Sequence, residues 1–280
     1  MQVLTTIKAM QSRSREWRGQ GETVALVPTM GYLHEGHLEL IRLARNQAGK
    51  VVVSIFVNPS QFAPGEDYED YPRDFSRDQE LCRKEGVDLI FNPAVEEMYE
   101  ADFSTWVVEE KLSANLCGKS RPGHFRGVTT IVCKLFNATL PDVAVFGQKD
   151  AQQALIIERM VRDLNFPVEI VLAPIVRDED GLAVSSRNVY LSAEQRRRAL
   201  SLSRGLQKAV TAFTTGERRA AELIKIVRDE LESADAAVDY VELVDRSTLQ
   251  PVTVVEQASL LAVAAFFGGT RLIDNCFLEP

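Results

Sequence analysis

Short apolar segments alternate with amphipathic segments along the first 175 residues, and this alternation limits the possible folds more than any other feature. Runs such as VVVSIFV at 51–57 are apolar at nearly every position, as strands are when both faces of a sheet are covered. The segments between them repeat apolar residues at helical spacing. Strands are expected at 23–27, 51–57, 87–91, 142–146 and 168–172, and helices at 34–46, 75–85, 128–138 and 151–164. This repetition predicts an α/β fold with a Rossmann-like, doubly wound parallel sheet.

The pattern changes after about Ile175. Two helices are expected at 193–213 and 220–233, followed by strands at 238–244, 260–266 and 272–277. Successive strands without intervening helices predict a small antiparallel sheet and therefore an α+β arrangement. We expect a Rossmann-like domain at 1–175 and a smaller C-terminal domain at 176–280, with the boundary between Ile175 and Arg187. A length of 280 residues agrees with two domains.

Composition narrows the classes of partner. The chain has 32 Lys and Arg against 40 Asp and Glu, and this net charge of -8 disfavours a protein whose main partner is nucleic acid. A local pocket can still bind a small anion. The first residues show no secretory pattern, and the longest apolar run, 260–267, is shorter than the ~20 residues of a membrane helix. We expect a soluble cytoplasmic protein with no membrane partner and with four reduced, structural cysteines.

His34 and His37 follow the first expected strand and lie on one face at the start of a helix. Free N–H groups at a helix start attract phosphate, and imidazoles add hydrogen-bond donors. Gly36 removes a side chain where phosphate could approach the backbone. Two alternatives stay open, namely a metal site and a structural pair, although His-Glu-Gly-His lacks the i,i+4 spacing of the helical zinc motif. The segment matches neither the G-x-G-x-x-G fingerprint nor a Walker loop.

Polar residues also follow the other expected strands, where ligands bind in open α/β sheets. Asn58 and Gln61 can donate and accept hydrogen bonds, which suits a substrate with carboxylate and hydroxyl groups. Arg121 belongs to a loop at 120–127 that concentrates cations beside glycines and is either anion-facing or merely solvated. Lys149 is placed to meet phosphate. Asp150 can cap the next helix, bind a ribose hydroxyl or hold a metal-bound water, and Gln153 follows one turn later.

A third group lies at the expected domain boundary. Ser185, Ser186 and Arg187 can close over a polyphosphate leaving group if this segment is a hinge. The three arginines at 196–198 fall within a helix, and we interpret them as a solvated face.

Several strings of the sequence resemble one family. The His-x-Gly-His pattern with a later Ser-Ser-Arg-Asn resembles the nucleotidyltransferase superfamily, whose site design is shared with class I aminoacyl-tRNA synthetases. The fuller strings VPTMG, LHEGH, FVNP, RPGHF, FGQKD and SSRN occur in the order found in the pantoate–β-alanine ligase (pantothenate synthetase) family. The similarity extends from about Val24 to Leu191, and a further string, LIDN at 272–275, extends it towards the end of the chain.

The resemblance implies an activity and a set of site residues. In this family ATP and pantoate form pantoyl adenylate and pyrophosphate, and β-alanine then gives pantothenate and AMP. Mg²⁺, a C-terminal lid domain and a homodimer are implied as well. The residues assigned to ATP are Met30, Gly31, Tyr32, Leu33, His34, Glu35, Gly36, His37, Gly147, Gln148, Lys149, Asp150, Val176, Val184, Ser185, Ser186 and Arg187. Gln61 and Gln153 are assigned to pantoate, and Gln61 also to β-alanine.

The chemistry needs donors where negative charge grows on phosphoryl and pyrophosphate oxygens. His34, His37, Lys149 and Arg187 are the candidate catalytic residues, whereas the direct ligands of Mg²⁺ are not assigned. No protein nucleophile is required, because positioning and electrostatics suffice for phosphoryl-type transfer. A closing second domain would protect the adenylate from water.

Four residues depart from the family pattern. Tyr32 stands where a small residue is common, Gln148 replaces a frequent glutamate, and Val184 replaces a frequent methionine. Cys117 stands where many members carry an acid, which puts an acidic role there in doubt. None of these changes removes a proposed phosphate contact.

Two other function classes remain to be distinguished. A nucleotidyltransferase would release a stable nucleotide conjugate, whereas the ligase releases AMP and an amide. A non-catalytic nucleotide-binding module would bind ATP without turnover, but the expected site carries more polar groups than binding needs. A tRNA synthetase is disfavoured by length and acidity.

Overall fold

The computed structural model describes all residues, 1–280, and divides them into two compact units. The first unit consists of Met1–Glu110, Arg121–Gly147 and Ile156–Pro174, and the second of Lys111–Ser120, Gln148–Leu155 and Ile175–Pro280. Each unit is described by itself. A division into domains at residue 175 stays a prediction.

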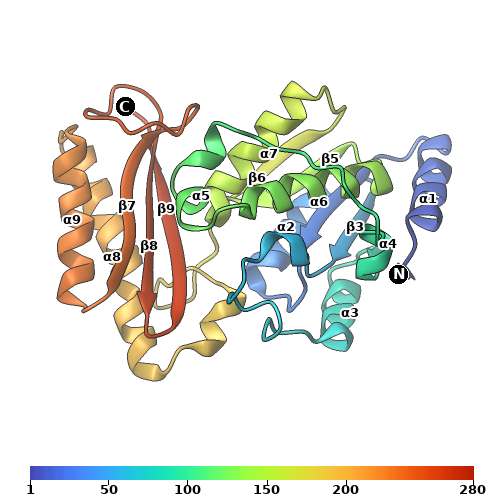
Figure 1. Ribbon diagram of the computed structural model, residues 1–280, viewed down its shortest axis with the longest axis horizontal. Coiled ribbons are helices and arrows are strands. Elements are labelled where there is room, and N and C mark those ends of the chain that lie inside the picture. Colours follow the sequence, from blue (N-terminus) through green and yellow to red (C-terminus); the bar gives the residue numbers. More distant parts are fainter. The chain divides into compact units, whose positions relative to one another are not determined.

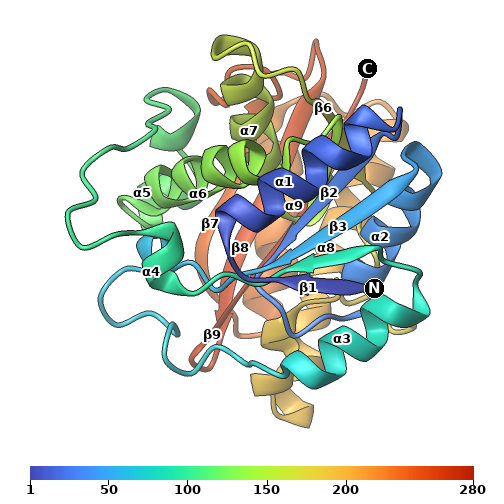
Figure 2. The ribbon, with the colours of Figure 1, turned by 90° about the vertical axis from the view of Figure 1, so that its right-hand side faces the viewer.

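A six-stranded parallel sheet forms the centre of the first unit (Figure 2). Its strands are β1 (Gln2–Leu4), β2 (Val24–Thr29), β3 (Lys50–Ile55), β4 (Leu89–Phe91), β5 (Val143–Gly147) and β6 (Glu169–Ala173), in the order β1-β4-β3-β2-β5-β6. The order runs in one direction from β2 to β4 and in the other from β5 to β6. The switch point, where such folds bind ligands, therefore lies between the carboxyl ends of β2 and β5.

Both faces of this sheet are buried because side chains alternate along each strand. Val27 and Val53 pack into a core with Ile41 of α2, whereas Leu26 and Val52 point to the opposite face, and all five side chains are fully buried. The helices of the unit are α1 (Ile7–Gly19), α2 (Glu35–Gln47), α3 (Phe75–Lys84), α4 (Val95–Met98) and α6 (His124–Thr139), and α7 (Ala151–Asp163) begins in the second unit and ends in the first. The strands are apolar at nearly every position because helices cover both faces of the sheet.

The second unit contains a three-stranded antiparallel sheet in the order β7 (Ala237–Asp245), β8 (Ser259–Phe267) and β9 (Thr270–Leu278). The long helices α8 (Ala193–Thr214) and α9 (Ala220–Ser233) pack on this sheet (Figure 1) and share one core with it. Shorter elements are the one-turn helix α5 (Cys117–Ser120) and the 3₁₀ turns η2 (Leu112–Ala114), η3 (Gln148–Asp150) and η4 (Ser186–Tyr190). A further 3₁₀ turn, η1 (Pro59–Gln61), belongs to the first unit.

The predicted fold class is confirmed, and every predicted helix and strand exists with small shifts of its ends. One end was wrong: α6 begins at His124 and not at 128, after Gly123 with a φ of 84°. The sequence analysis also missed β1 and α1. Helix α1 escapes notice because only Met10, Ser14 and Trp17 of its 13 residues are buried.

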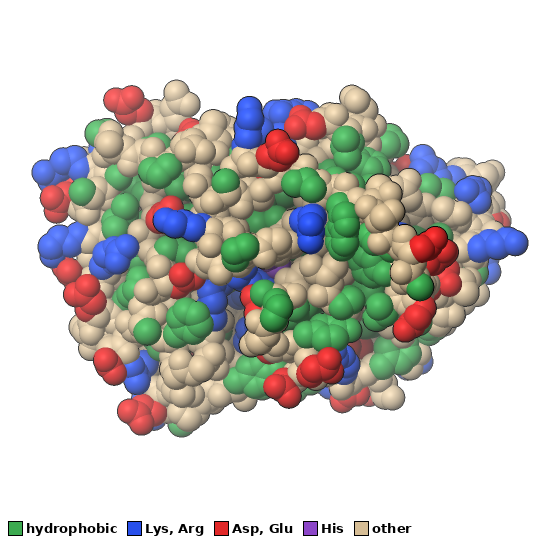
Figure 3. Space-filling model, in the orientation of Figure 1, with side chains coloured by type: hydrophobic (Ala, Val, Ile, Leu, Met, Phe, Trp, Pro, Cys, Tyr) green, Lys and Arg blue, Asp and Glu red, His purple; other side chains and the backbone are tan.

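The surface carries charges of both signs, interspersed with apolar side chains on the face in view (Figure 3). The interpretation of residues 196–198 as a solvated face needs correction. Arg196 pairs with Asp178 and Asp180, and Arg198 pairs with Asp235, so only Arg197 is exposed. No helix is both long and apolar enough to cross a bilayer.

Candidate functional site

The residues predicted for the site fall into both units. The first unit holds Met30, Gly31, Tyr32, Leu33, His34, Glu35, Gly36, His37, Asn58, Gln61, Arg121 and Gly147. The second holds Gln148, Lys149, Asp150, Gln153, Val176, Val184, Ser185, Ser186 and Arg187. We describe the surroundings of each group within its own unit.

The loop between β2 and α2 has an unusual backbone. Gly31 and Tyr32 both adopt positive φ angles, 83° and 49°. A Cβ at Gly31 would lie 3.0 Å from the Asp78 carboxylate and from the Ile55 side chain, so glycine is required there by space as well as by φ. The Gly31 N–H donates to Thr29 Oγ1 at 3.1 Å. The loop is therefore a tight and specific turn at the carboxyl end of β2.

Asp78 holds this loop, and the sequence analysis missed it. Its carboxylate is 1% exposed and accepts hydrogen bonds from Tyr32 N at 2.8 Å and Leu33 N at 2.7 Å. Burial raises the pKa of the Asp78 carboxyl, although the bonds from Leu33 and Tyr32 act in the opposite direction. The available signal was an acid on the buried stripe of α3, four residues before Cys82, which is fully buried.

Arg77 adds a second connection between α3 and the loop. Its guanidinium donates to the Leu33 carbonyl at 2.8 Å and lies 5.2 Å from the centre of the Tyr32 ring. The tyrosine that departs from the family pattern thus stacks under a cation. Two consecutive side chains of α3 therefore hold the loop: Asp78 binds its backbone, and Arg77 contacts both its backbone and the Tyr32 ring.

His34 and His37 stack on each other at the start of α2. Their ring centres lie 4.0 Å apart at an angle of 29°, and His34 is the N-cap residue. The His34 N–H donates to His37 Nδ1 at 3.3 Å, so the neutral His37 ring carries its proton on Nε2. The two rings lie on one face at the start of α2, as the three-residue spacing predicted, whereas a donor role of His37 Nε2–H stays a prediction.

Two neighbours of this pair have side-chain surroundings that the sequence did not indicate. A Cβ at Gly36 would lie 3.0 Å from Cε1 and Nδ1 of His34, so the glycine makes room for the imidazole. The approach of a phosphate to the backbone of Gly36 stays a prediction. Glu35 turns to Arg42, which also pairs with Glu39 and Glu85. The hydrogen bonds to Glu85 and Glu35 raise the pKa of Arg42. The Glu35 side chain is therefore already engaged in an ion pair.

Asn58 is 1% exposed and is saturated by bonds within the chain. Its Nδ2 donates to Gln61 Oε1 at 3.0 Å and to the Gly127 carbonyl at 3.2 Å, and its Oδ1 accepts from Ser60 Oγ and Tyr99 OH. With both amide hydrogens used, Asn58 orients Gln61.

Gln61 lies beside Met30, which joins two predicted site segments. Its Nε2 is 3.4 Å from Met30 Sδ, while its Oε1 accepts from Asn58. Gly127 of α6 packs against the turn that carries Gln61, because a Cβ there would lie 2.4 Å from the Ser60 carbonyl oxygen. The structure therefore brings together the segments that follow β2 and β3.

Arg121 already has an anion. It forms a two-point ion pair with Glu66, at 2.7 Å through Nε and 2.6 Å through Nη2. Burial acts to raise the pKa of Glu66, but the Arg121 hydrogen bonds and charge outweigh it and lower this pKa. Arg121 also donates to the Gln61 carbonyl at 3.3 Å.

His124 completes this cluster and has a defined tautomer. Its Nδ1 lies 2.8 Å from the Gln61 carbonyl, which can only accept, so Nδ1 carries the proton. Its Nε2 then accepts from Arg121 Nη1 at 3.2 Å. Arg121 and His124 of the predicted cationic loop thus both bind the backbone carbonyl of Gln61.

The second unit contains Lys149 in the turn η3, directly before α7. Asn275 of β9 donates through Nδ2 to the carbonyls of Gln148 and Lys149, at 3.0 Å each. Asp150 is exposed and Gln153 half-buried. Gln152 was missed: its side chain is buried and bonds the backbone of Leu112, Asn115 and Cys117.

Residues 176–187 form a compact hairpin, and its last two residues begin the turn η4 (Ser186–Tyr190). Val184 N donates to the Val176 carbonyl at 3.0 Å, which brings the two predicted ATP contacts side by side. Arg187 N donates to Ser185 Oγ at 3.3 Å, so the serine caps η4. Asn188 ties this turn back to the Ala183 carbonyl at 3.1 Å.

Cys117 occupies a polar environment in the second unit. Its Sγ lies 3.1 Å from Tyr240 OH and 3.6 Å from Arg271 Nη2, and Arg271 forms its ion pair with Asp239. Burial raises the pKa of Tyr240, which keeps the phenol protonated. An acid at position 117 would face Arg271, and in this chain Asp239 supplies the carboxylate for that cation.

Comparison with known proteins decides the family. The model of the family described as pantoate-beta-alanine ligase matches residues 2–277. The chain belongs to this family. It is 56% identical over 279 residues to the pantothenate synthetase of Thermotoga petrophila, covering 99% of this chain and 100% of the relative. Identity with the pantothenate synthetase of Moorella thermoacetica is 55% over 280 residues, which is all of this chain and 99% of the relative.

Solved structures agree with this family. The pantothenate synthetase of Thermus thermophilus has a TM-score of 0.94 and 46% identity, with complete coverage of both chains. The pantoate-beta-alanine ligase of Francisella tularensis, complexed with beta-gamma ATP and beta-alanine, has a TM-score of 0.80 and 31% identity, covering 99% of this chain and 97% of the other. The resemblance seen in the motifs is thereby confirmed.

Proposed function

We propose that this ligase condenses pantoate with β-alanine in two steps that consume ATP. In the first step a pantoate carboxylate oxygen bonds to the α-phosphorus of ATP, and the bond from that phosphorus to pyrophosphate breaks. In the second step the β-alanine amine attacks the carbonyl of pantoyl adenylate, loses a proton and expels AMP. The products are pantothenate, AMP and pyrophosphate.

The observation that carries the proposal is the His34–His37 pair at the start of α2, at the carboxyl end of β2. This position is beside the switch point of the sheet. The His37 tautomer presents an Nε2–H donor, and the first turn of α2 adds backbone N–H groups. Donors fixed in advance stabilise the charge that grows on phosphate oxygens, because they need no reorganisation during the reaction.

The remaining residues receive their roles from the family motifs. Lys149 and Arg187 would complete the catalytic donors, and the ATP contacts would be those assigned above. Gln61 and Gln153 would bind pantoate, and Gln61 would also contact β-alanine. The bonds of Asn58 and Arg121 support a positioning role for both, since each holds Gln61: both amide hydrogens of Asn58 are used within the chain, and four of the five N–H groups of Arg121 are engaged by Glu66, His124 and Gln61.

Mg²⁺ would accompany ATP and neutralise part of its charge. The chain brings no group of three or more His, Cys, Asp or Glu side chains close enough to hold a metal ion. Mg²⁺ commonly binds through substrate phosphates, water and one or two carboxylates. A chain without a cluster of three such side chains is compatible with this kind of binding. The exposed carboxylate of Asp150 is the candidate contact, through water.

Two further expectations follow from the family and the sequence. We propose a homodimer, which sedimentation at several protein concentrations tests. A cytoplasmic location stays a prediction from the sequence.

Pantoate-dependent exchange of pyrophosphate into ATP tests the function. Wild-type protein should catalyse exchange with pantoate and no amine, and β-alanine should then yield AMP and an amide. His37→Ala should lower the exchange rate about 100-fold, as loss of one oxyanion donor does. Near-normal exchange in this variant would contradict the role of His37, and a stable nucleotide conjugate in place of AMP would indicate a nucleotidyltransferase.

A further inference from the structure

Two consecutive residues of β9 form bonds that the sheet does not need. Asp274 and Asn275 are 2% and 4% exposed, and their side chains carry a charge and an amide into the interior of the second unit. Buried groups of this kind cost free energy unless they are fully hydrogen-bonded. Their partners therefore indicate why these side chains are present.

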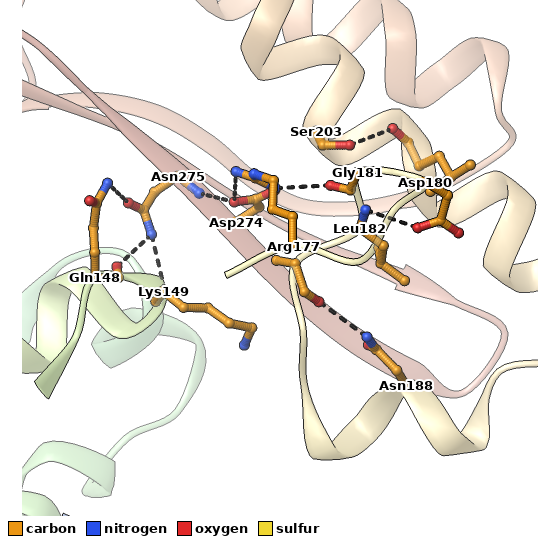
Figure 4. Close-up of polar contacts among 12 residues, drawn as sticks. Gln148, Lys149, Arg177, Asp180, Gly181, Leu182, Asn188, Ser203, Asp274 and Asn275 are labelled. Carbon is orange, nitrogen blue, oxygen red and sulfur yellow. Dashed lines mark hydrogen bonds and ion pairs between the residues drawn. The ribbon is translucent and has the colours of Figure 1, made fainter. Parts of the chain in front are cut away.

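All side-chain partners of Asn275 lie in the turn that contains Lys149. The two Nδ2 hydrogens go to the carbonyls of Gln148 and Lys149, at 3.0 Å each, and Oδ1 accepts from Gln148 Nε2 at 3.3 Å. Figure 4 shows one of these contacts ending on the backbone of Lys149 and the others on Gln148, while the Lys149 side chain leads away from Asn275. The amide thus holds the Lys149 backbone and leaves the ammonium group outside the network.

Asp274 holds the other predicted ATP segment. Its carboxylate forms a two-point ion pair with Arg177, at 2.6 and 3.0 Å. Arg177 also donates to the Gly181 carbonyl at 3.2 Å (Figure 4). The backbone of Arg177 forms an antiparallel bridge with Ala183. The ion pair therefore fixes the hairpin whose ends carry Val176 and residues 184–187.

We propose that Asp274 and Asn275 are positioning residues for ATP. They hold the Lys149 turn and the 176–187 hairpin on adjacent positions of one strand, so that the two segments keep a constant separation. This inference rests on the proposed function, in which Lys149 and Arg187 contact ATP. Adjacent residues of a strand point to opposite sides, which explains how one short segment reaches both partners.

Asn275→Ala tests the amide. Loss of both Nδ2 bonds frees the Lys149 backbone, and a displacement of about 1 Å is enough to lower kcat/KM for ATP about 100-fold. The KM for pantoate should change less than the KM for ATP, because Asn275 bonds neither Gln61 nor Gln153, the two residues assigned to pantoate. Ser259→Ala is the matched control, since Ser259 is 2% exposed in the same sheet and its Oγ donates only to the Gln257 carbonyl. It should lower the melting temperature without changing the ATP kinetics.

A double-variant cycle separates positioning from general stability. If Asn275 acts through Lys149, Asn275→Ala should cause no further loss of exchange in a Lys149→Met background. Independent, multiplicative losses would overturn the positioning role. An unchanged rate for Lys149→Met alone would instead contradict the proposed function of Lys149, and the inference with it. Asn275→Ser, a milder change, repeats the cycle if the alanine variant does not fold.

Asp274→Asn tests in the same way whether Asp274 positions the 176–187 hairpin through Arg177. It keeps the side-chain shape but weakens the pair with Arg177, so it should raise the KM for ATP, and this effect should disappear in an Arg177→Met background. An equal effect of Asp274→Asn with and without Arg177 would overturn the assignment. A rise in the KM for pantoate of the same size would do so as well, because a general loss of structure does not discriminate between substrates.

Discussion

Gly127→Ala should damage the enzyme through one methyl group. The added Cβ would lie 2.4 Å from the carbonyl oxygen of Ser60, 2.6 Å from its carbonyl carbon and 2.7 Å from Gln61 N. All three atoms belong to the backbone, so no side chain can rotate away. Ordinary contact begins at 3.4 Å, and α6 and the turn η1 must therefore separate by about 1 Å.

The magnitude follows from two opposing terms. Overpacking of this kind costs about 1–3 kcal/mol, and alanine regains about 1 kcal/mol of helix propensity over glycine. A net loss of about 1 kcal/mol lowers the melting temperature by about 2–4 °C in a chain of this size. The effect on catalysis should be larger, because a shift of about 1 Å in Gln61 can lower kcat/KM for pantoate about 100-fold.

Pyrophosphate release at varied pantoate concentrations, together with thermal unfolding, measures both effects. Gly19→Ala is the control, since Gly19 also lies in a helix but a Cβ there has no neighbour within 4 Å. It should keep wild-type kinetics and should not lower the melting temperature, because alanine is the better helix former and meets no clash there. Wild-type kinetics and melting temperature in Gly127→Ala would refute the reasoning, as would an equal loss in both variants.

Three further predictions concern Asp78, which is buried, and Glu66, which is half-buried. Asp78→Asn replaces one of the two accepting oxygens by an amide NH₂ group, which would face the N–H of Tyr32 or of Leu33. Expressed as free energies, the loss in exchange rate should exceed the loss in stability, because relief of carboxylate burial offsets part of the lost hydrogen bonding; equal losses would contradict this. The pKa of Asp78 is raised from 3.8, so its contribution to the free energy of unfolding should decline as pH rises from 3.8 through the raised value, and denaturant titrations of wild type against Asp78→Asn should show this slope. The pKa of Glu66 is lowered from 4.5 by Arg121, so the contribution of Glu66 to the free energy of unfolding should be present above pH 4.5 and lost as pH falls through the lowered pKa. Denaturant titrations of wild type against Glu66→Gln should therefore show a contribution that rises with pH, opposite to that of Asp78.

Much of the fold was predictable because hydrophobic patterning is a local property. The almost entirely apolar segment at 51–57 and the apolar residues on one face of α2 directly reflect burial. Both elements lie close to where they were expected. The pair of His34 and His37 was likewise predictable, because its chemistry depends on three-residue spacing at a helix start. Helix α1 was not predictable in this way, since only a narrow stripe of it is buried.

The partners of polar side chains were less accessible to sequence reasoning. Arg121 looked like an anion-facing cation, but its anion is Glu66, which lies 55 residues away in the sequence. Asp78 is 45 residues from Leu33, whose N–H it accepts, and Asn275 is 126 residues from Lys149. No local pattern records such distant contacts.

The sequence by itself determined the parallel sheet, the family motifs and the chemical types present in the site. Periodicity and spacing carry that information because they depend on neighbours along the chain. The tertiary structure alone decided which groups hold the predicted site residues in place. These groups are the Asp78 carboxylate, which binds the β2–α2 loop, the saturated amide of Asn58, and two residues of β9, of which Asn275 holds the Lys149 turn and Asp274 holds the 176–187 hairpin. Their roles depend on where each buried donor finds its acceptor, and only the folded chain brings the two together.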